Sequence, residues 1–269
     1  MQINFSAIDG PRMAAWDFVQ GLLSWRLWAF LGLQDIRQRY RRSSFGPLWL
    51  TLGLGVTILG IGILYARILK VTTGDFIPFL AVSLLVWNFI STVVNESVSL
   101  FLVGAGLMTS TRIPYTSFVL RGLVRNLIVA AHCTIPVAVA FFYYKHPVGW
   151  IALAAIPGLL LVLLNLYWIS LCIGIICLRF RDMGQIVIYG TQLALFVTPI
   201  IWMPTQISPD SPILKFNPLN HLIELVRAPL FYGVFPSESY VVALLMLLVG
   251  GVCSGAVMVY FRRYLVFWL

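Results

Sequence analysis

Four arginines stand within six residues in the stretch QDIRQRYRRSSFGPLW, residues 34–49. They are Arg37, Arg39, Arg41 and Arg42. A guanidinium group can bind phosphate oxygens in pairs, which a lysine ammonium cannot do. After this cluster the chain carries no charge until Arg67. The cluster therefore has two interpretations: it sets the orientation of a membrane span, or it contacts phosphate groups at a membrane surface.

The rest of the chain lacks the patterns of an enzyme or of an ion-coupled transporter. It has no GxxxxGK[ST] phosphate loop, no HExxH and no GxSxG. Its histidines, His132, His146 and His221, are too scattered for a zinc site. The expected spans contain no Asp or Glu, and Glu96 only follows one of them, so no proton relay is predicted. We expect no catalytic residue, no metal and no cofactor in this chain, and a partner must supply the energy for any transport.

The composition is that of an integral membrane protein. Of the 269 residues, 60% are hydrophobic and only 10% are charged, with a mean hydropathy of +0.94, whereas soluble domains carry about 25% charged residues. The net charge of +9 does not predict a nucleic-acid partner, because the basic residues form no stripe on a polar domain. The cysteines lie in apolar runs without metal-ligand spacing and are interpreted as small buried hydrophobes: Cys133, Cys172, Cys177 and Cys253.

Six uncharged windows are long enough to cross a bilayer, which takes about 20 apolar residues per helix. They cover residues 48–66, 76–95, 127–144, 150–176, 183–203 and 240–260. The fourth belongs to a longer uncharged run that could kink at Pro157. An even number of spans places both termini on one side. If that side is the cytoplasm, the inner segments hold thirteen of the 18 Lys and Arg residues, and this asymmetry predicts cytoplasmic termini.

Residues 14–33 are apolar but contain two charges, Asp17 and Arg26. A charge at the middle of a bilayer costs about 3 kcal/mol, so a seventh span is not predicted. Asp17, Gln20 and Ser24 recur at helical spacing, and tryptophans suited to the headgroup boundary are frequent in this segment. The pattern predicts an amphipathic helix that lies in the inner membrane interface. No signal-peptide pattern precedes it.

Two connections are too long to be simple loops. The inner stretch 96–126 is predicted to form a short surface helix, broken near Pro114. Its apolar face would dock into a partner and consists of Leu100, Val103 and Leu107. The outer stretch 204–238 is predicted to contain an amphipathic or re-entrant helix that ends at Pro229. Its apolar residues at helical spacing are Leu219, Leu222, Ile223 and Val226.

Four segments, in order along the chain, resemble motifs of the permease subunits of ABC-2 type polysaccharide exporters. The first is DIRQRYRRSSFGPLW, in which Phe45 stands where the family usually has leucine. The family's positions in it are filled by Asp35, Arg39, Tyr40, Ser43, Gly46 and Trp49. The other segments are WNFISTVVNESVSLF, LRFRDMGQIV and NPLNHLIELVRAPLF. The resemblance covers nearly the whole chain. Within the family, the chain is similar to O-antigen export permeases.

The resemblance implies an all-α membrane protein with one transmembrane domain over residues 1–269. It implies a dimer of six-span subunits in a bacterial inner membrane, surrounded by membrane lipids. Two separate nucleotide-binding subunits would bind ATP and Mg²⁺, and a lipid-linked polysaccharide would pass between the two permease copies. The N-terminal helix would help to form a cleft for the ATPase, the helix after the second span would couple to it, and the outer stretch would hold gate helices.

Four sets of residues follow from the motifs and their chemistry. Contacts to the lipid-diphosphate end of the substrate are expected from Arg37, Arg39, Arg41 and Arg42. Rings that line a glycan channel, or else only the core and the interfacial belt, are Tyr40, Trp49, Tyr65, Trp87, Tyr189 and Phe196. ATPase coupling is expected from Ser97, Leu100, Val103, Leu107, Phe180, Arg181 and Asp182. The external gate would include Asn217, Pro218, Leu222 and Arg227.

Several alternatives stay open. Phe180–Asp182 could be a plain turn, or could pair with the N-terminal helix instead of with an ATPase. Within the family, a capsule or teichoic acid permease is possible. From another class, the chain could be an ion-coupled secondary transporter or a membrane enzyme that acts on lipid-linked sugars. Either of these should show buried acidic residues or a polar catalytic cluster in its spans.

Overall fold

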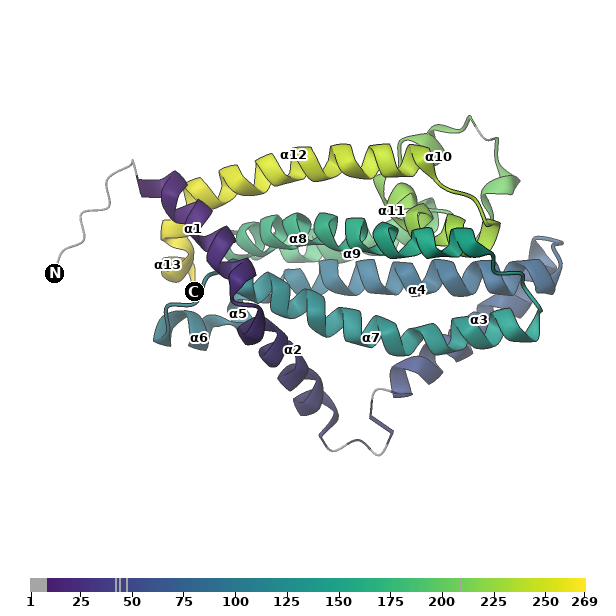
Figure 1. Ribbon diagram of the computed structural model, residues 1–269, viewed down its shortest axis with the longest axis horizontal. Helices are drawn as coiled ribbons and strands as arrows, with labels where there is room; N and C mark the ends of the chain where they lie inside the picture. The colour runs from purple at the N-terminus through teal and green to yellow at the C-terminus, as the bar shows by residue number, and fades with distance from the viewer. Residues whose placement is uncertain (1–8, 42, 44, 47, 209) are drawn as a thin grey trace.

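The computed structural model describes residues 9–41, 43, 45–46, 48–208 and 210–269, and throughout these residues the chain forms helices and turns without a β-strand. Five helices are long and apolar enough to cross a membrane, so the chain is a multi-pass membrane protein (Figure 1). They are α3 (Leu48–Ile68), α4 (Thr73–Ser97), α7 (Thr116–Tyr143), α8 (Ala155–Arg179) and α12 (Ser237–Phe261). The 3₁₀ turn η1 (Trp150–Ala154) precedes α8, and α12 continues into η4 (Arg262–Tyr264) and α13 (Leu265–Trp268).

The sixth apolar segment is shorter than predicted. Helix α9 (Met183–Val197) has 15 residues, which rise about 22 Å, whereas the hydrocarbon core of a bilayer is about 30 Å thick. The helix ends at Val197, inside the predicted span 183–203, because Pro199 disfavours helical geometry in the residue before it. Thr198 is accordingly extended, with φ −85° and ψ 139°. Counting charges could not detect this stop, because the whole window is uncharged.

Helix α7 begins at Thr116 instead of at residue 127. The sequence-based window excluded Arg121 and Arg125 because a lone charge is costly in a membrane. In the structure both arginines form ion pairs with carboxylates of neighbouring helices, so the helix extends through them. The break predicted near Pro114 is present, between α6 (Ala105–Ser110) and α7.

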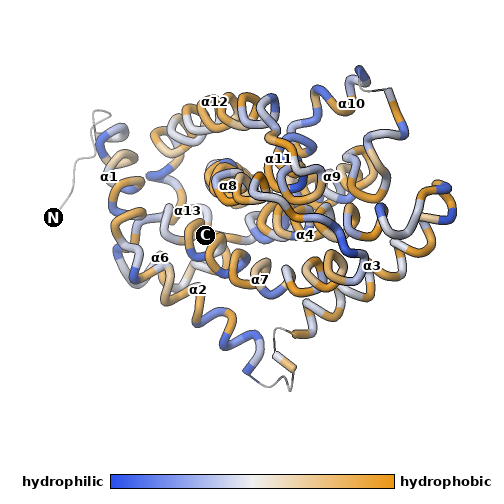
Figure 2. Tube along the Cα trace, turned by 45° about the vertical axis from the view of Figure 1, so that its right-hand side comes forward, coloured by the Kyte–Doolittle hydropathy of each residue, from blue (hydrophilic) through white to orange (hydrophobic). Residues whose placement is uncertain are grey.

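Helix α4 is the centre of the bundle. It packs against α3, α7, α8, α9 and α11 (Pro218–Arg227), and Figure 2 shows it surrounded by these elements. Buried residues make up 72% of its most apolar stretch, against 22% for α3, α7 and α12. Close packing with α3 requires Gly62, because a Cβ there would lie 2.8 Å from Ile77 Cγ1. The long helices around α4 are apolar over most of their length (Figure 2).

The N-terminal segment forms two helices, α1 (Asp9–Leu23) and α2 (Trp25–Tyr40), instead of one. They cross the bundle obliquely, α1 over α7 and the end of α12, and α2 along α7 (Figure 1). The polar residues at helical spacing lie toward the protein: Asp17 is fully buried, and Gln20 and Ser24 are half-buried. Apart from Arg12 and Arg26, the exposed side is mainly apolar, with Trp16, Val19, Leu22, Leu23, Trp25 and Phe30. Because Asp17 is used to hold α7, the helix presents its hydrophobic residues outward.

The segment after α9 returns into the bundle. It contains η2 (Pro204–Gln206), α10 (Pro212–Lys215), α11 and the π-helical turn η3 (Ala228–Tyr232). Pro229 does not end the helical path as predicted: the α-helix stops two residues earlier and η3 carries the chain to Gly233, at φ 65°. Helix α11 packs on α8 so closely that a Cβ at Gly158 would lie 2.3 Å from the carbonyl oxygen of Leu225.

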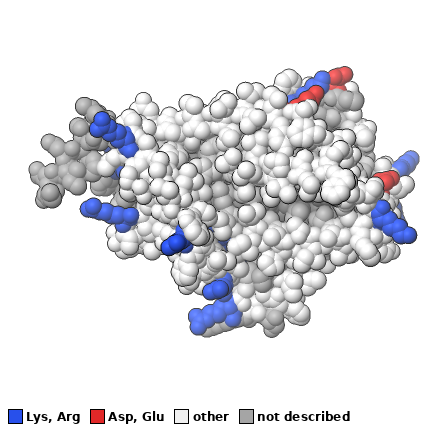
Figure 3. All heavy atoms as spheres, in the orientation of Figure 1, with Lys and Arg blue, Asp and Glu red and all other residues white. Residues whose placement is uncertain are grey.

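Charged side chains gather toward the two ends of the molecule. On the face in Figure 3, basic residues lie along the left and lower margins, and acidic and basic residues lie together at the right. The broad area between them carries no charge on this face. This distribution is the one expected for a protein whose middle lies in lipid.

Candidate functional site

Five charged residues meet at the end of the bundle where α2 crosses α4 and α7. We call Asp35, Arg39, Glu96, Arg121 and Arg125 the inner ionic cluster. Asp35 accepts from Arg121 Nε at 2.7 Å and from Arg125 Nη1 at 3.2 Å. Glu96 accepts from Arg39 Nη2 at 3.1 Å and also pairs with Arg125. The cluster therefore joins three helices through charge-assisted hydrogen bonds.

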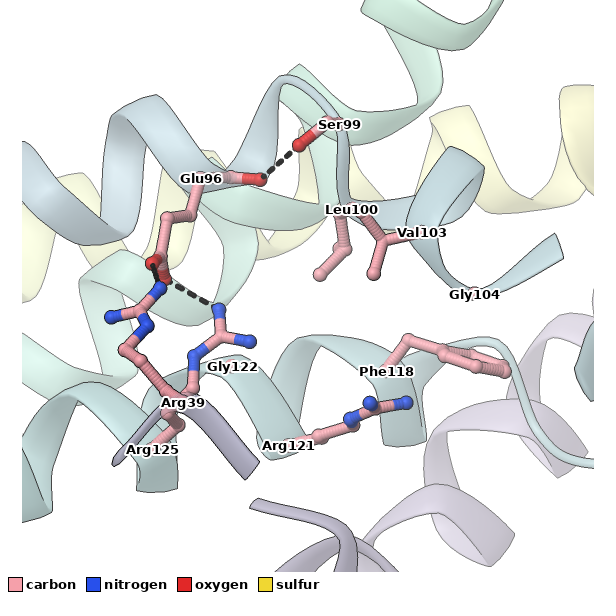
Figure 4. Close-up of a pocket in the computed structure, with 10 residues that line it drawn as sticks. All are labelled: Arg39, Glu96, Ser99, Leu100, Val103, Gly104, Phe118, Arg121, Gly122 and Arg125. Carbon is pink, nitrogen blue, oxygen red and sulfur yellow. Dashed lines mark hydrogen bonds and ion pairs between the residues drawn. The ribbon is translucent and has the colours of Figure 1, made fainter. Parts of the chain in front are cut away.

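The inner ionic cluster borders a cavity of about 320 Å³. In Figure 4, the guanidinium groups of Arg39 and Arg125 lie beside the carboxylate of Glu96, and Arg121 lies farther along α7. Apolar walls come from α5 (Leu100–Val103) and from Phe118. Three arginines face two carboxylates, so the site has one excess positive charge at neutral pH. Such a cavity can hold an anionic group through guanidinium donors.

The structure brings together only part of the predicted arginine cluster. Arg39 joins the cavity, whereas Arg37 and Arg41 are exposed on the last turn of α2 and just after it. Arg42 lies outside the described residues. Sequence reasoning missed Arg121 and Arg125 as members of the site. Their spacing of four residues places both on one helical face, which was the available signal.

A second polar junction fixes α1 to the rest of the chain. The Asp17 carboxylate accepts from the backbone N–H groups of Tyr115 at 3.2 Å and Thr116 at 3.0 Å, so it caps α7. It also accepts from Arg262 Nε, beyond α12, at 3.2 Å. Burial raises the pKa of the Tyr115 hydroxyl above its usual value. Gly21 allows this approach, because a Cβ there would lie 1.9 Å from Thr116 Oγ1.

A cavity of about 470 Å³ opens along the bundle, and we call it the lateral groove. It is bordered by α3, α4, α7 and α9. Trp49, Thr57 and Trp87 contribute to its lining, as do Asn88 and Thr92. Figure 2 places α3 and α9 on the same side of α4. The groove combines rings and polar side chains in a bundle that is otherwise apolar.

The predicted aromatic residues divide into three groups. Trp49 and Trp87 line the lateral groove. Tyr189 and Phe196 are exposed on α9, with 62% and 61% of their surfaces accessible. Tyr65 packs in part against the core, and Tyr40 is half-buried at the end of α2.

The coupling residues also separate. Ser97 is buried and donates to the carbonyl oxygen of Val93 at 2.6 Å. Leu100 packs in part on the hydrophobic core. These two side chains face their own chain, because α5 folds back onto α7 and α8. Leu107 is half-buried on α6. The exposed residues of the set are Val103, Phe180, Arg181 and Asp182.

The two coupling segments lie at one end of the bundle. A Cβ at Gly184, in the first turn of α9, would lie 2.6 Å from Val98 Cγ1, just after α4. The turn Phe180–Asp182 is therefore next to the start of α5. Within the described part of the chain, Arg181 and Asp182 form no ion pair with the N-terminal helices. Arg262 and the arginines of α7 fill that role instead.

The predicted gate residues form an anchored element. Asn217 caps α11 by accepting from the N–H groups of Leu219 and Asn220, and Pro218 occupies the first turn. Leu222 and Arg227 are fully buried. Arg227 donates to Ser83 Oγ at 3.0 Å, to the carbonyl oxygen of Pro199 and to Glu224. Its guanidinium carbon lies 4.7 Å from the ring centre of Phe79. Arg227, which the count of basic residues assigned to an outer segment, thus links α11 to α4 and to the residues just after α9.

These features describe a helical membrane protein. Within the described residues, no group of three His, Cys, Asp or Glu side chains could hold a metal. Residues 26–231 match the ABC-2 type transporter family, and the chain belongs to that family as a membrane permease, not an enzyme.

The chain is 25% identical over 227 residues to the O-antigen export system permease protein RfbA of Klebsiella pneumoniae, covering 81% of this chain and 86% of the relative. A protein of the same name from Myxococcus xanthus is 25% identical over 218 residues, covering 78% and 82% of the two chains.

Proposed function

We propose that this permease forms the channel of an ATP-driven exporter that carries a lipid-linked polysaccharide of the O-antigen class across the bacterial inner membrane. The observation that carries the proposal is the lateral groove, where Trp49 and Trp87 stand beside Asn88 and Thr92. Rings can lie against the apolar faces of sugars, and amides can bond their hydroxyl groups. The similarity to O-antigen export permeases over most of the chain supports the same substrate class.

The proposed assembly contains two copies of this chain and two nucleotide-binding subunits. The copies meet with their α3 and α9 sides facing, so that two lateral grooves enclose one path. Both termini lie in the cytoplasm with the arginine-rich ends of α2, α7 and α8. The five long helices α3, α4, α7, α8 and α12 make six spans together with α9. Helices α1 and α2 lie in the inner interface, and α11 re-enters the bilayer from outside as the gate.

The proposed mechanism is mechanical, and ATP and Mg²⁺ are bound by the partner subunits. When these close on ATP, they push on the exposed Val103 and on the turn Phe180–Asp182. Those segments contact the inner ends of α4, α8 and α9, which border or adjoin the lateral groove. The cavity at the inner ionic cluster receives the diphosphate of the lipid carrier at Arg39, near the exposed Arg37 and Arg41.

The test is to express the chain with the ATPase encoded beside it and to reconstitute both in nanodiscs. We expect a two-plus-two complex that hydrolyses ATP, while the chain alone is inactive. Phe180→Ala should weaken co-purification of the ATPase by about tenfold or more, as loss of an interface anchor does. Phe142→Ala is the control, because Phe142 is also an exposed phenylalanine but lies at the opposite end of the bundle.

Two results would overturn the proposal. One is a chain that binds no ATPase and moves a solute with an ion gradient. The other is a complex in which Phe142→Ala, and not Phe180→Ala, releases the ATPase, which would reverse the orientation. Transfer of lipid-linked polysaccharide by the wild-type complex is then measured directly, and no transfer of any glycan would exclude the substrate class.

A further inference from the structure

Amide side chains on the membrane helices are distributed unevenly. On α3, α4, α7, α8, α9 and α12, within the described residues, the exposed ones are Asn88, Gln185 and Gln192. Asn88 belongs to α4 and the two glutamines to α9. Helices α8 and α12 expose none. The exposed amides therefore gather on α4 and α9, two of the four helices that border the lateral groove.

An amide side chain that faces hydrocarbon has no partner, and this is costly. Elsewhere in the bundle the chain avoids that cost. Buried Asn165 donates to the carbonyl oxygens of Leu161 at 2.9 Å and Ala243 at 3.1 Å and accepts from Trp168 at 3.1 Å. Polar groups in a membrane that are not satisfied internally mark a substrate path or a water-filled space. The side of α9 that carries Gln185 and Gln192 is thus unsuited to lipid, although Ile186, Leu193 and Val197 expose apolar surface beside it.

The amides on α9 alternate with rings. Gln185, Tyr189, Gln192 and Phe196 follow one another at spacings of four, three and four residues, so they form one stripe on the helix. Gln192 stands three residues before Leu195, which lines the lateral groove. On the far side of the groove, Asn88 lines it together with Thr57 of α3. The stripe on α9 therefore adjoins the lateral groove at Leu195.

We propose that Asn88, Gln185 and Gln192 are hydrogen-bonding contacts for the hydroxyl groups of a hydrated sugar chain, with Tyr189 and Phe196 as platforms for its apolar faces. The inference rests on the proposed function and names its contact residues. An amide can both donate and accept hydrogen bonds. It can therefore bind successive hydroxyl groups of a sugar chain that moves past it. Spaced rings allow the chain to slide between equivalent positions.

A second copy of the chain is the competing occupant, because amides also join helices in membranes. The stripe is unsuited to that role. Close helix pairs use small residues at their contact, whereas this stripe alternates its amides with the large rings Tyr189 and Phe196. Large rings hold two such helices apart and leave a space between them. That space is where the glycan would pass.

The first experiment measures hydration of the stripe in the reconstituted complex. Single cysteines at positions 88, 185 and 192 are placed in a chain whose native cysteines are replaced by alanine. Native Cys253, exposed on α12, is kept alone in the control chain. A charged, membrane-impermeant methanethiosulfonate reacts with thiolate in water, so the three stripe positions should react about tenfold or more faster than Cys253. Equal slow rates would overturn the proposal.

The second experiment measures glycan transfer by Gln185→Leu/Gln192→Leu, which keeps side-chain size and removes the hydrogen bonds. We expect transfer to fall about tenfold to hundredfold, since each lost bond contributes modestly and the two act together. Leu244→Ile on the outer face of α12 is the control and should transfer glycan as the wild type does.

Unchanged transfer in the double variant, or loss of the dimer, would show that the amides do not bind sugar. These outcomes differ from failure of the proposed function, in which the wild-type complex itself transfers no glycan.

Discussion

Helices α9 and α12 both have one side open to their surroundings, and the two open sides are built from different residues. The outer face of α12 is wholly apolar and consists of Val241, Leu244, Leu245, Leu248, Val249 and Val252. The outer stripe of α9 alternates amides with rings. Lipid suits the first surface and not the second. The difference indicates which side of the bundle lies against the bilayer and which side meets another molecule.

The two helices are also attached differently. Helix α12 packs along α8, where Gly250 lets Trp168 approach, and its inner end is held by the ion pair between Asp17 and Arg262. Helix α9 rests mainly on α4, with a hydrogen bond of 2.8 Å from Thr191 to Asn95. A helix with few internal contacts can shift with less disruption than one that is packed along its length.

The largest expected effect comes from placing a charge on each outer face. Leu248→Arg sets a guanidinium near the middle of α12, where insertion costs about 2.5–3.5 kcal/mol. Gln192→Arg sets the same group near the middle of α9, in a hydrated space. The yield of membrane-inserted protein should fall about tenfold or more for Leu248→Arg and less than about threefold for Gln192→Arg. Equal losses would remove the distinction between the two faces.

An effect of comparable size concerns the anchor of α12. Asp17→Ala removes a buried carboxylate, the cap of α7 and the partner of Arg262, so we expect a loss of about 3–5 kcal/mol in the free energy of unfolding. Denaturant titration in detergent micelles measures it. Asp182→Ala, at the exposed turn before α9, is the control and should change stability by less than about 0.5 kcal/mol. A small effect of Asp17→Ala would mean that α1 does not hold α12.

Packing of the two helices is compared by adding one methyl group to each. A Cβ at Gly250 of α12 would lie 2.0 Å from Trp168 Cε2, whereas a Cβ at Gly190 of α9 meets nothing within 4 Å. Gly250→Ala should therefore lose about 1–3 kcal/mol through overpacking. Gly190→Ala should gain up to about 1 kcal/mol from helix propensity. Thermal unfolding of both variants in the same detergent gives the comparison, and the reverse order would contradict it.

The smallest effect lies in the loop that follows α9. The ammonium of Lys215 donates to Asp210 at 2.6 Å, and this hydrogen bond holds the pKa of Asp210 below its usual value. Because the pKa of Asp210 is lowered in the folded state, the pair contributes stability at pH values above the pKa of the unfolded chain, about 4. That contribution is lost as the pH falls through the pKa of the folded state.

Both side chains of this pair are exposed, so Asp210→Asn should leave the unfolding midpoint at pH 7 nearly unchanged. The wild type should lose a little stability below about pH 4, and the variant should not show this small loss. Unfolding of the wild type and the variant between pH 7 and pH 3 measures this difference. A large change at neutral pH would mean that the pair is shielded in the assembly.

Much of the fold could be predicted from charge and hydropathy. The failures arise because a count of charges takes no account of ion pairs between helices or of backbone geometry. The cores of α3, α4, α8 and α12 follow from uncharged windows. The start of α7 does not, because Arg121 and Arg125 are tolerated only through Asp35 and Glu96, which come from other helices. The end of α9 was readable from Pro199, but a count of charges ignores backbone geometry.

The site was less predictable because exposure and pairing arise only on folding. The arginine cluster pointed to Arg39, yet its neighbours in the cavity come from α4 and α7. Asp17 looked like a solvent-facing residue and is buried. Asn88, Gln185 and Gln192 are unremarkable in the sequence, since an amide in a span can equally be satisfied inside, as Asn165 is. Only the arrangement of helices separates the two cases.

The 15 residues of α9 also act on the membrane around it. Its rise of about 22 Å falls roughly 8 Å short of the hydrocarbon thickness. Such a hydrophobic mismatch is accommodated by local thinning of the bilayer, at a fraction of a kcal/mol per Å. If α9 crosses the bilayer as proposed, the two headgroup layers are drawn together where α9 meets lipid. A glycan that passes beside α9 would then travel a shorter distance between headgroups than beside the longer helices.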